Sequence, residues 1–172
     1  IINPIEYYAV IVGVTNYASN TAEMIGGEIF RMLIAGASGK AARSFGGYLL
    51  NDNENWKQEN IKLLTDPPIF NPFGAPSITR EDIKNAIDWM KSKADANDVC
   101  LFYFAGHGAA STNDVSMCMS DGTLHSPGIK LSEVLAAAAE STVGELVILL
   151  DCCFSGAAGE VPQLQASGSM LP

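Results

Sequence analysis

Four short segments of the chain are rich in apolar residues and contain few polar ones. Residues 7–14, 99–105 and 146–150 are continuous apolar runs, and residues 61–65 form a shorter segment of the same kind. Such runs are typical of strands that are buried on both faces of a parallel sheet. We therefore predict four strands, and we expect the strand at residues 146–150 to lie inside the sheet, away from an exposed edge.

Helical spacing of apolar residues separates these strands. Thr79 is a predicted N-cap, and Asp82, three residues later, completes a capping box. The stripe that follows predicts a helix packed on the core, formed by Ile83, Ala86, Ile87, Met90 and Ala94. Weaker patterns predict helices over residues 41–50 and 130–140 and one that starts near residue 21.

The remaining segments are predicted to be loops. Residues 51–60 are polar and turn-like, residues 66–76 are rich in proline, and the stretch after His107 is rich in Ser, Asn, Asp and Gly. The length of 172 residues is typical of one domain. We expect this domain to span residues 1–156 and a linker without periodic pattern to begin at residue 157.

Strands that alternate with helices predict an α/β fold, with a mostly parallel sheet and helices on both faces. Proteins of this class place their functional groups beyond the carboxyl ends of the strands. Residues 106–108 follow one predicted strand and residues 151–153 follow another. These two strand ends are therefore where we expect the chemistry of the protein.

Charge and cysteine content narrow the function further. The formal net charge is -9, which argues against a nucleic-acid partner because such binding needs a basic surface. No apolar run is long enough to span a membrane, and the first residues lack the basic segment of a secretory signal. The four cysteines contain no C-x-x-C pair, so we assign no metal site and expect free thiols in a reducing, cytoplasmic setting.

The two strand ends carry a histidine and a cysteine. His107 lies between Gly106 and Gly108, and Cys153 follows the last predicted strand. A thiolate is the nucleophilic form of cysteine, and histidine is its natural base because its pKa lies near neutrality. The other histidine, His125, lies in a polar loop and is predicted to be a solvated surface residue.

Strand alternation separates the two adjacent cysteines. Successive side chains of a strand point to opposite faces, so Asp151 and Cys153 should point the same way and Cys152 the other way. Cys152 is then predicted to be a buried, inert thiol. Cys100 starts a predicted core strand and is expected to be structural, whereas Cys118 has no assigned role.

Four segments in order resemble the successive blocks of the caspase/metacaspase family: residues 8–17, 59–66, 102–108 and 151–156. The resemblance covers nearly the whole chain and implies a caspase-like three-layer sandwich. It also implies a cysteine endopeptidase with a dyad of His107 and Cys153, whose oxyanion hole is formed by the backbone N–H groups of Gly108 and Cys153. A catalytically inert caspase-fold scaffold module is the alternative. A flavodoxin-like binding domain is disfavoured because no glycine-rich loop follows the first strand.

The resemblance also implies a substrate preference. Asp151 stands where metacaspases carry the aspartate of the S1 pocket, which binds Arg or Lys at P1 through charge-assisted hydrogen bonds. The family has an Asp-Ala pair in an early helix, and the best-spaced match here is Ala41-Ala42. The second pocket carboxylate is therefore absent, and Asp52 or Asp114 would have to substitute for it.

Three further expectations come from the same resemblance. No cofactor is required. The resemblance implies Asp114, Asp121 and Glu160 as candidate ligands for activation by Ca²⁺, an ion that needs six or more oxygen ligands. The partners are a protein or peptide substrate and a small p10-type subunit or C-terminal continuation that pairs with the last strand. Family members are processed in the linker, but residues 157–172 contain no Arg or Lys, so self-processing at a basic residue would occur beyond Pro172.

Overall fold

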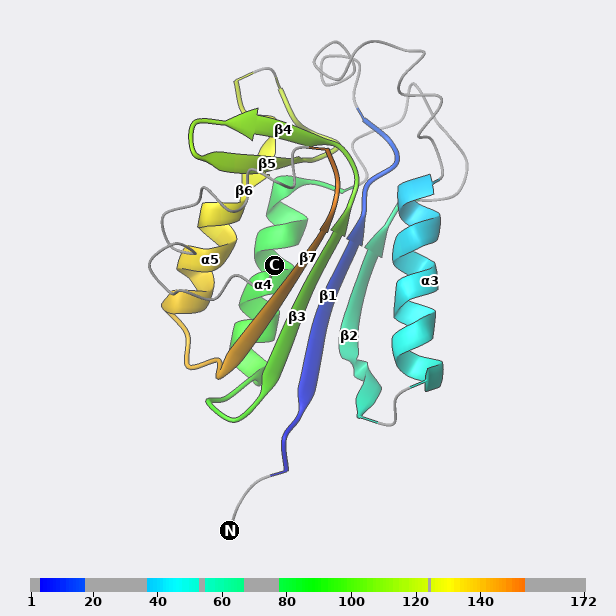
Figure 1. The fold of residues 1–172 in the computed structure, drawn as a ribbon, viewed down its shortest axis with the longest axis vertical. Coiled ribbons are helices and arrows are strands. Elements are labelled where there is room, and N and C mark those ends of the chain that lie inside the picture. The colour runs from blue at the N-terminus through cyan, green and yellow to red at the C-terminus, as the bar shows by residue number, and fades with distance from the viewer. Residues whose placement is uncertain (1–3, 18–36, 53–54, 67–77, 124, 154–172) are drawn as a thin grey trace.

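A four-stranded parallel sheet forms the centre of the protein in the computed structural model, which describes residues 4–17, 37–52, 55–66, 78–123 and 125–153. The strands are β1 (Tyr7–Gly13), β2 (Trp56–Thr65), β3 (Val99–Ala105) and β7 (Glu145–Asp151), in the spatial order β2-β1-β3-β7. All four run in the same direction, so their carboxyl ends meet at one edge of the sheet (Figure 1).

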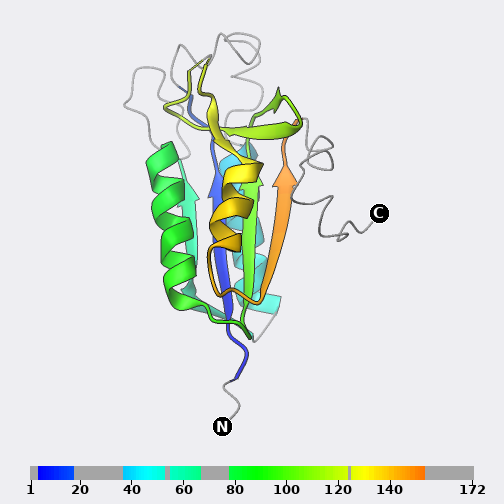
Figure 2. The same ribbon diagram turned by 90° about the vertical axis from the view of Figure 1, so that its left-hand side faces the viewer.

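Helices cover both faces of this sheet. The helix α3 (Ala37–Asp52) packs on one face, and α4 (Arg80–Lys93) and α5 (Leu131–Ala139) pack on the other (Figure 2). Side chains of β3 alternate between the two layers: Phe102 and Phe104 lie in the α4 cluster, whereas Tyr103 lies in the α3 cluster. The predicted three-layer α/β fold with a mostly parallel sheet is confirmed.

The predicted helices are found where their residues are described. The helix α4 begins at the capping box of Thr79 and Asp82, and all five residues of its predicted stripe are buried. The helices predicted over residues 41–50 and 130–140 correspond to α3 and α5. The helix predicted near residue 21, the proline-rich stretch and the linker lie outside the described residues. No helix in the described part of the chain is long and apolar enough to cross a membrane.

The loop predicted after His107 is wrong. A small antiparallel sheet lies there, formed by β4 (Gly108–Ser111), β5 (Asp114–Cys118) and β6 (Gly128–Lys130). Asn113 has a φ of 53° in the turn between β4 and β5, and asparagine tolerates this left-handed conformation in tight hairpin turns. The polar composition that suggested a mobile loop therefore belongs in part to a hairpin turn.

The polar turn predicted over residues 51–60 is also wrong in its second half, because β2 already begins at Trp56. Contacts with Glu6 and Tyr7, at the start of β1, hold the first residues of β2 in place. The Glu6 carboxylate accepts hydrogen bonds from Lys57 Nζ at 2.6 Å and from Asn60 Nδ2 at 3.2 Å, and the Trp56 ring lies 5.4 Å from that of Tyr7.

The expectation that β7 is buried on both faces is wrong for the described chain. β7 is an edge strand there, since it pairs only with β3 among the strands described. Most of its side chains are half-buried or exposed, and Leu149 is 40% exposed. An apolar strand at an open edge is unusual, because unpaired backbone groups there attract another strand.

A buried carboxylate joins the ends of β1 and β2 close to the functional edge. Asp66 is 1% exposed, and its Oδ2 accepts hydrogen bonds from the backbone N–H groups of Thr15 and Asn16, the latter at 2.9 Å. Burial raises the pKa of the Asp66 carboxyl above its ordinary value, against the opposing effect of these two hydrogen bonds. Asp66 thus fixes the segment that leads from β1 to Tyr17.

We predict that Asp66→Ala lowers the free energy of unfolding by about 1–3 kcal/mol, because two buried N–H donors lose their acceptor. Asp66→Asn keeps an acceptor oxygen and should lose much less. The raised pKa means that the folded state binds a proton more tightly, so the contribution of Asp66 to stability declines as pH rises from about 4 through its folded pKa. Urea unfolding at several pH values measures both effects. Equal losses in the two variants would contradict the role given to the acceptor oxygen.

Candidate functional site

A cavity of about 390 Å³ opens where β3 and β7 end beside the first turn of α3. Backbone and side chains from all three elements line it. The lining residues are Ala37, Ser38, Ala41, Ala105, Gly106, Asp151, Cys152 and Cys153. The cavity therefore contains two of the residues that the sequence nominated, Asp151 and Cys153, and it is bordered by the turn that carries His107.

The turn after β3 holds His107 in a buried position. Its side chain is 3% exposed, and burial lowers the pKa of the imidazole below the ordinary value. The backbone carbonyl of His107 accepts a hydrogen bond from Cys118 N at 2.9 Å, and its N–H donates to the Tyr17 hydroxyl at 2.8 Å. A neutral imidazole at physiological pH is the form that can accept a proton from a thiol.

The two strand ends contact each other through their backbones. Gly106 N donates to the Asp151 carbonyl at 3.3 Å. A Cβ placed on Gly108 would lie 2.0 Å from the carbonyl oxygen of Cys153 and 3.1 Å from Cys152 Sγ. Only glycine therefore fits at position 108 without displacing Cys152 and Cys153, so the segments that carry the nominated histidine and cysteine are held against one another.

The four thiols differ in their surroundings. Cys153 is exposed, whereas Cys152 is half-buried and packs against the cluster on the α4 side of the sheet. Burial raises the pKa of Cys152 to about 11, that of Cys100 to about 11 and that of Cys118 to about 12. These three thiols carry almost no thiolate at neutral pH. Cys152 is thus less exposed than Cys153, but it is not fully buried as strand alternation predicted, and it lines the same cavity as Cys153.

Asp151 is held by an aromatic pair at the other side of the cavity. The carboxylate is exposed, and its Oδ2 accepts a hydrogen bond from the Tyr103 hydroxyl at 3.3 Å. The Tyr103 ring stacks on Phe45 of α3 with 4.6 Å between ring centroids. Ala41 lines the same cavity, so this position of α3 contributes a methyl group where a second carboxylate was considered.

The candidate calcium ligands are dispersed. Asp114 Oδ1 accepts from Val115 N at 2.8 Å and from Ser132 N at 3.4 Å, and Asp121 Oδ1 accepts from Arg80 N at 3.1 Å. Glu160 lies outside the described residues. Among the residues with described positions, no three His, Cys, Asp or Glu side chains form a group that could hold a metal ion. Calcium activation stays a prediction.

Sequence reasoning missed two tyrosines at the site, Tyr17 and Tyr103. Tyr17 is part of the block that carried the family resemblance, but nothing in the pattern indicates that its hydroxyl meets the His107 backbone. Tyr103 lies inside an apolar strand and was interpreted only as a core residue. Both contacts join segments far apart in the chain, so local periodicity could not reveal them.

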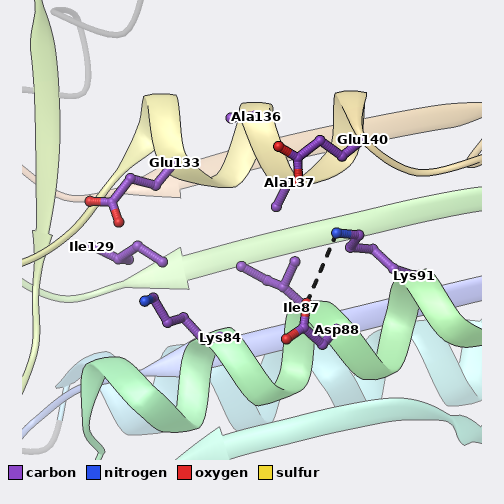
Figure 3. A pocket seen from close by; sticks show the side chains of 9 residues that line it. All are labelled: Lys84, Ile87, Asp88, Lys91, Ile129, Glu133, Ala136, Ala137 and Glu140. Carbon is purple, nitrogen blue, oxygen red and sulfur yellow. Dashed lines mark ion pairs between the residues drawn. The ribbon is translucent and has the colours of Figure 1, made fainter.

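A second cavity, of about 380 Å³, lies between α4 and α5 (Figure 3). Lys84, Lys91 and Asp88 of α4 lie opposite Glu133 of α5 and Glu140, which follows α5, and aliphatic side chains line the space between them. Asp88 and Lys91 form an ion pair at 4.0 Å. No cysteine or histidine lines this groove, so among the described residues the strand-end cavity is the better candidate for covalent chemistry.

The chain matches a known family model and several curated proteins. A family model described as the caspase domain matches residues 49–170. Metacaspase-1B of Neurospora crassa is 26% identical over 141 residues, which cover 75% of this chain and 32% of the relative. Metacaspase-1A of Aspergillus fumigatus is 27% identical over 134 residues, with 71% and 31% covered. The chain thus spans about a third of the length of the curated relatives it matches.

A solved structure supports the fold. The crystal structure of protein GSU0716 from Geobacter sulfurreducens superposes with a TM-score of 0.57 at 14% identity, and the match covers 86% of this chain and 50% of that one. At this level of identity the likeness concerns the arrangement of strands and helices.

Proposed function

This chain belongs to the caspase/metacaspase family, and on that premise we propose that it is a cysteine endopeptidase in which His107 and Cys153 form the catalytic dyad. The observation that carries the proposal is the contact between the backbones of Gly108 and Cys153. Because of this contact, two residues lie next to each other at the carboxyl edge of the sheet. They are Gly108, which follows the proposed base, and Cys153, the proposed nucleophile. The exposure of the Cys153 side chain at the cavity adds support.

The proposed reaction proceeds in two halves. His107 takes the thiol proton, Cys153 Sγ attacks the scissile carbonyl carbon, and the negative charge moves to the carbonyl oxygen. The backbone N–H groups of Gly108 and Cys153 stabilise this oxyanion, each by about 3 kcal/mol. The imidazolium then gives its proton to the leaving amine as the C–N bond breaks. Water hydrolyses the resulting thioester, which restores the free thiol and releases the carboxylic acid.

A catalytically inert scaffold of the same fold is the second candidate. The burial of His107, which is only 3% exposed, favours this candidate, since a catalytic base must reach the thiol and the leaving amine. The presence of a histidine and a cysteine at two strand ends that contact each other favours catalysis. Peptide hydrolysis by the complete protein separates the two functions.

We predict that Cys153→Ala lowers peptide hydrolysis by about 1,000-fold or more, because the nucleophile is lost. Cys152→Ala is the matched control and should keep most activity, since its thiol packs against the core and is protonated at neutral pH. Initial rates on a fluorogenic peptide measure both, and near-ultraviolet circular dichroism shows that each variant is folded. An active Cys153→Ala with an inactive Cys152→Ala would reverse the assignment of the nucleophile.

We further propose that Asp151 selects Arg or Lys at the P1 position of the substrate. Its carboxylate is exposed at the cavity that Cys153 also lines, so a basic side chain that enters there can form a charge-assisted, bidentate contact. The hydrogen bond from Tyr103 and the stacking of Tyr103 on Phe45 fix the direction of the carboxylate. With Ala41 in place of a second acid, Asp151 supplies the negative charge among the described residues that line the cavity.

Peptides with Arg or Lys at P1 should be cleaved and those with Asp should not. Asp151→Asn should lower kcat/KM for Arg peptides about tenfold or more, because the guanidinium loses its counter-charge. Glu145→Gln removes one negative charge at the other end of β7 and is the matched control, with activity unchanged. The panel is run with and without calcium, which also tests the calcium hypothesis. Efficient cleavage after Asp would contradict the proposed specificity.

The open edge of β7 is the basis for a proposal about a partner. We propose that a further strand, from a p10-type subunit or from another part of the same protein, pairs with β7. The apolar sequence of the strand and the exposure of Leu149 support this pairing, because backbone groups and aliphatic side chains at an edge gain hydrogen bonds and burial from a neighbour.

Hydrogen exchange followed by NMR tests the partner strand in the complete protein. A paired β7 should show slow exchange at consecutive backbone amides, as in the central strand β3. An open edge should show protection at alternate amides only, because every second N–H of an edge strand points to solvent. This alternating pattern in the fully active protein would refute the proposed pairing.

A further inference from the structure

Tyr17 lies directly against the histidine that the proposed function requires. It is 5% exposed and follows β1, whereas His107 follows β3. The Tyr17 hydroxyl donates a hydrogen bond to the Val14 carbonyl at 3.1 Å and accepts one from His107 N at 2.8 Å. The centroids of the Tyr17 and His107 rings are 4.9 Å apart, with the planes tilted by 57°. One side chain therefore contacts both the backbone and the imidazole of His107.

The glycine before the histidine accommodates this tyrosine. A Cβ on Gly106 would lie 2.9 Å from the Tyr17 hydroxyl oxygen and 2.7 Å from Cζ of Phe104. Both distances are below normal van der Waals contact, so a side chain at position 106 would displace the hydroxyl from the His107 backbone. Glycine at position 106 thus leaves the space that the Tyr17 hydroxyl occupies.

The segment that carries Tyr17 is itself fixed. The Asp66 carboxylate accepts hydrogen bonds from the N–H groups of Thr15 and Asn16, the two residues before Tyr17. The Thr15 hydroxyl oxygen accepts another from Gly39 N of α3 at 3.1 Å. Contacts from β2 and α3 therefore hold the backbone from which Tyr17 reaches His107.

We propose that Tyr17 is a positioning residue for His107: its hydroxyl holds the backbone of the histidine and its ring holds the imidazole, so that the base stays next to the end of β7, which carries Cys153. This role rests on the proposed function, because it gives Tyr17 a task in the same dyad. Tyr17 acts through His107 and does not line the cavity that contains Asp151.

The groups around Tyr17 make the titration of His107 a specific readout. Burial raises the pKa of Tyr17 well above its usual value, raises that of Cys118 to about 12 and that of Cys152 to about 11. Those three groups keep their protons between pH 5 and 8, whereas burial lowers the pKa of the His107 imidazole. Among the described residues, the other acid that acts on Tyr17 is Asp66, whose pKa is raised, and Asp66→Asn controls for it.

Steady-state kinetics of the complete protein tests the hydroxyl. Tyr17→Phe keeps the ring and removes the contact to the His107 backbone, so kcat should fall roughly tenfold to a hundredfold with KM within about twofold. Rates are divided by the concentration of active sites, titrated with a peptidyl acyloxymethyl ketone, so that misfolded protein does not count. Tyr48→Phe loses a hydroxyl at an exposed position of α3 and should match the wild type. An unchanged kcat in Tyr17→Phe would overturn the positioning role.

An NMR titration tests the ring and does not depend on peptidase activity. The chain has two histidines, so the imidazole Cε1–Hε1 signals of His107 and the exposed His125 can be followed separately. In Tyr17→Leu water reaches the imidazole, so the titration midpoint of His107 should rise toward about 6.5. Tyr17→Phe should keep the low midpoint of the wild type. An unchanged His107 midpoint in Tyr17→Leu would overturn the role of the ring.

The two readouts separate this inference from the proposed function. A wild-type protein that cleaves no peptide, but whose His107 midpoint responds to Tyr17→Leu, would refute the peptidase and support the contact. If the wild-type protein cleaves peptides, but neither Tyr17 variant changes kcat or the His107 midpoint, the result would support the peptidase and refute the role of Tyr17.

Discussion

The close approach of Gly108 to Cys153 is the constraint on which the candidate site depends. A Cβ at position 108 would lie 2.0 Å from the Cys153 carbonyl oxygen, so glycine is required by contact between two chain segments. Parallel pairing brings these segments together, since Ala105 of β3 is in register with Asp151 of β7. The pairing of β3 with β7 thus sets the positions of His107 and Cys153, the proposed base and nucleophile, relative to each other.

The opposite faces of the sheet divide the residues near the site into two sets. On the α3 side, the Tyr103 hydroxyl donates a hydrogen bond to Asp151, which lines the cavity, and the Tyr103 ring stacks on Phe45. On the α4 side, Cys152 packs with the larger core cluster that also includes Tyr17 and Cys118. In the proposed function, substrate recognition and positioning of the histidine therefore belong to different layers. Variants on the α3 side should change specificity, and variants on the α4 side should change turnover.

Much of the fold followed from the sequence because parallel α/β sheets have a strong local signature. β3 was predicted with its observed limits, and the capping box of α4 was predicted with both residues. The hairpin of β4 and β5 was missed because its short strands contain polar residues, and the one turn residue with positive φ, Asn113, was interpreted as part of a loop. The exposure of β7 was missed because an apolar run predicts a buried strand but does not show which strands cover it. Among the described strands, only β3 pairs with β7.

The site was predicted less completely than the fold. Sequence reasoning nominated His107, Cys153 and Asp151 from their places after strands, and the structure brings all three to one edge of the sheet. The structure shows that the glycines beside His107 make room for Tyr17 and Cys153. Such contacts depend on tertiary structure, and so no local pattern indicates them.

Covalent labelling tests the central claim most directly. The complete protein is treated with a peptidyl acyloxymethyl ketone that carries Arg at P1, and the modified residue is identified by peptide mass spectrometry. The account predicts one adduct, on Cys153 Sγ, whose formation is slowed strongly in Asp151→Asn. It also predicts that the rate follows the ionisation of His107. An adduct on Cys152, or no adduct on any of the four cysteines, would contradict the account.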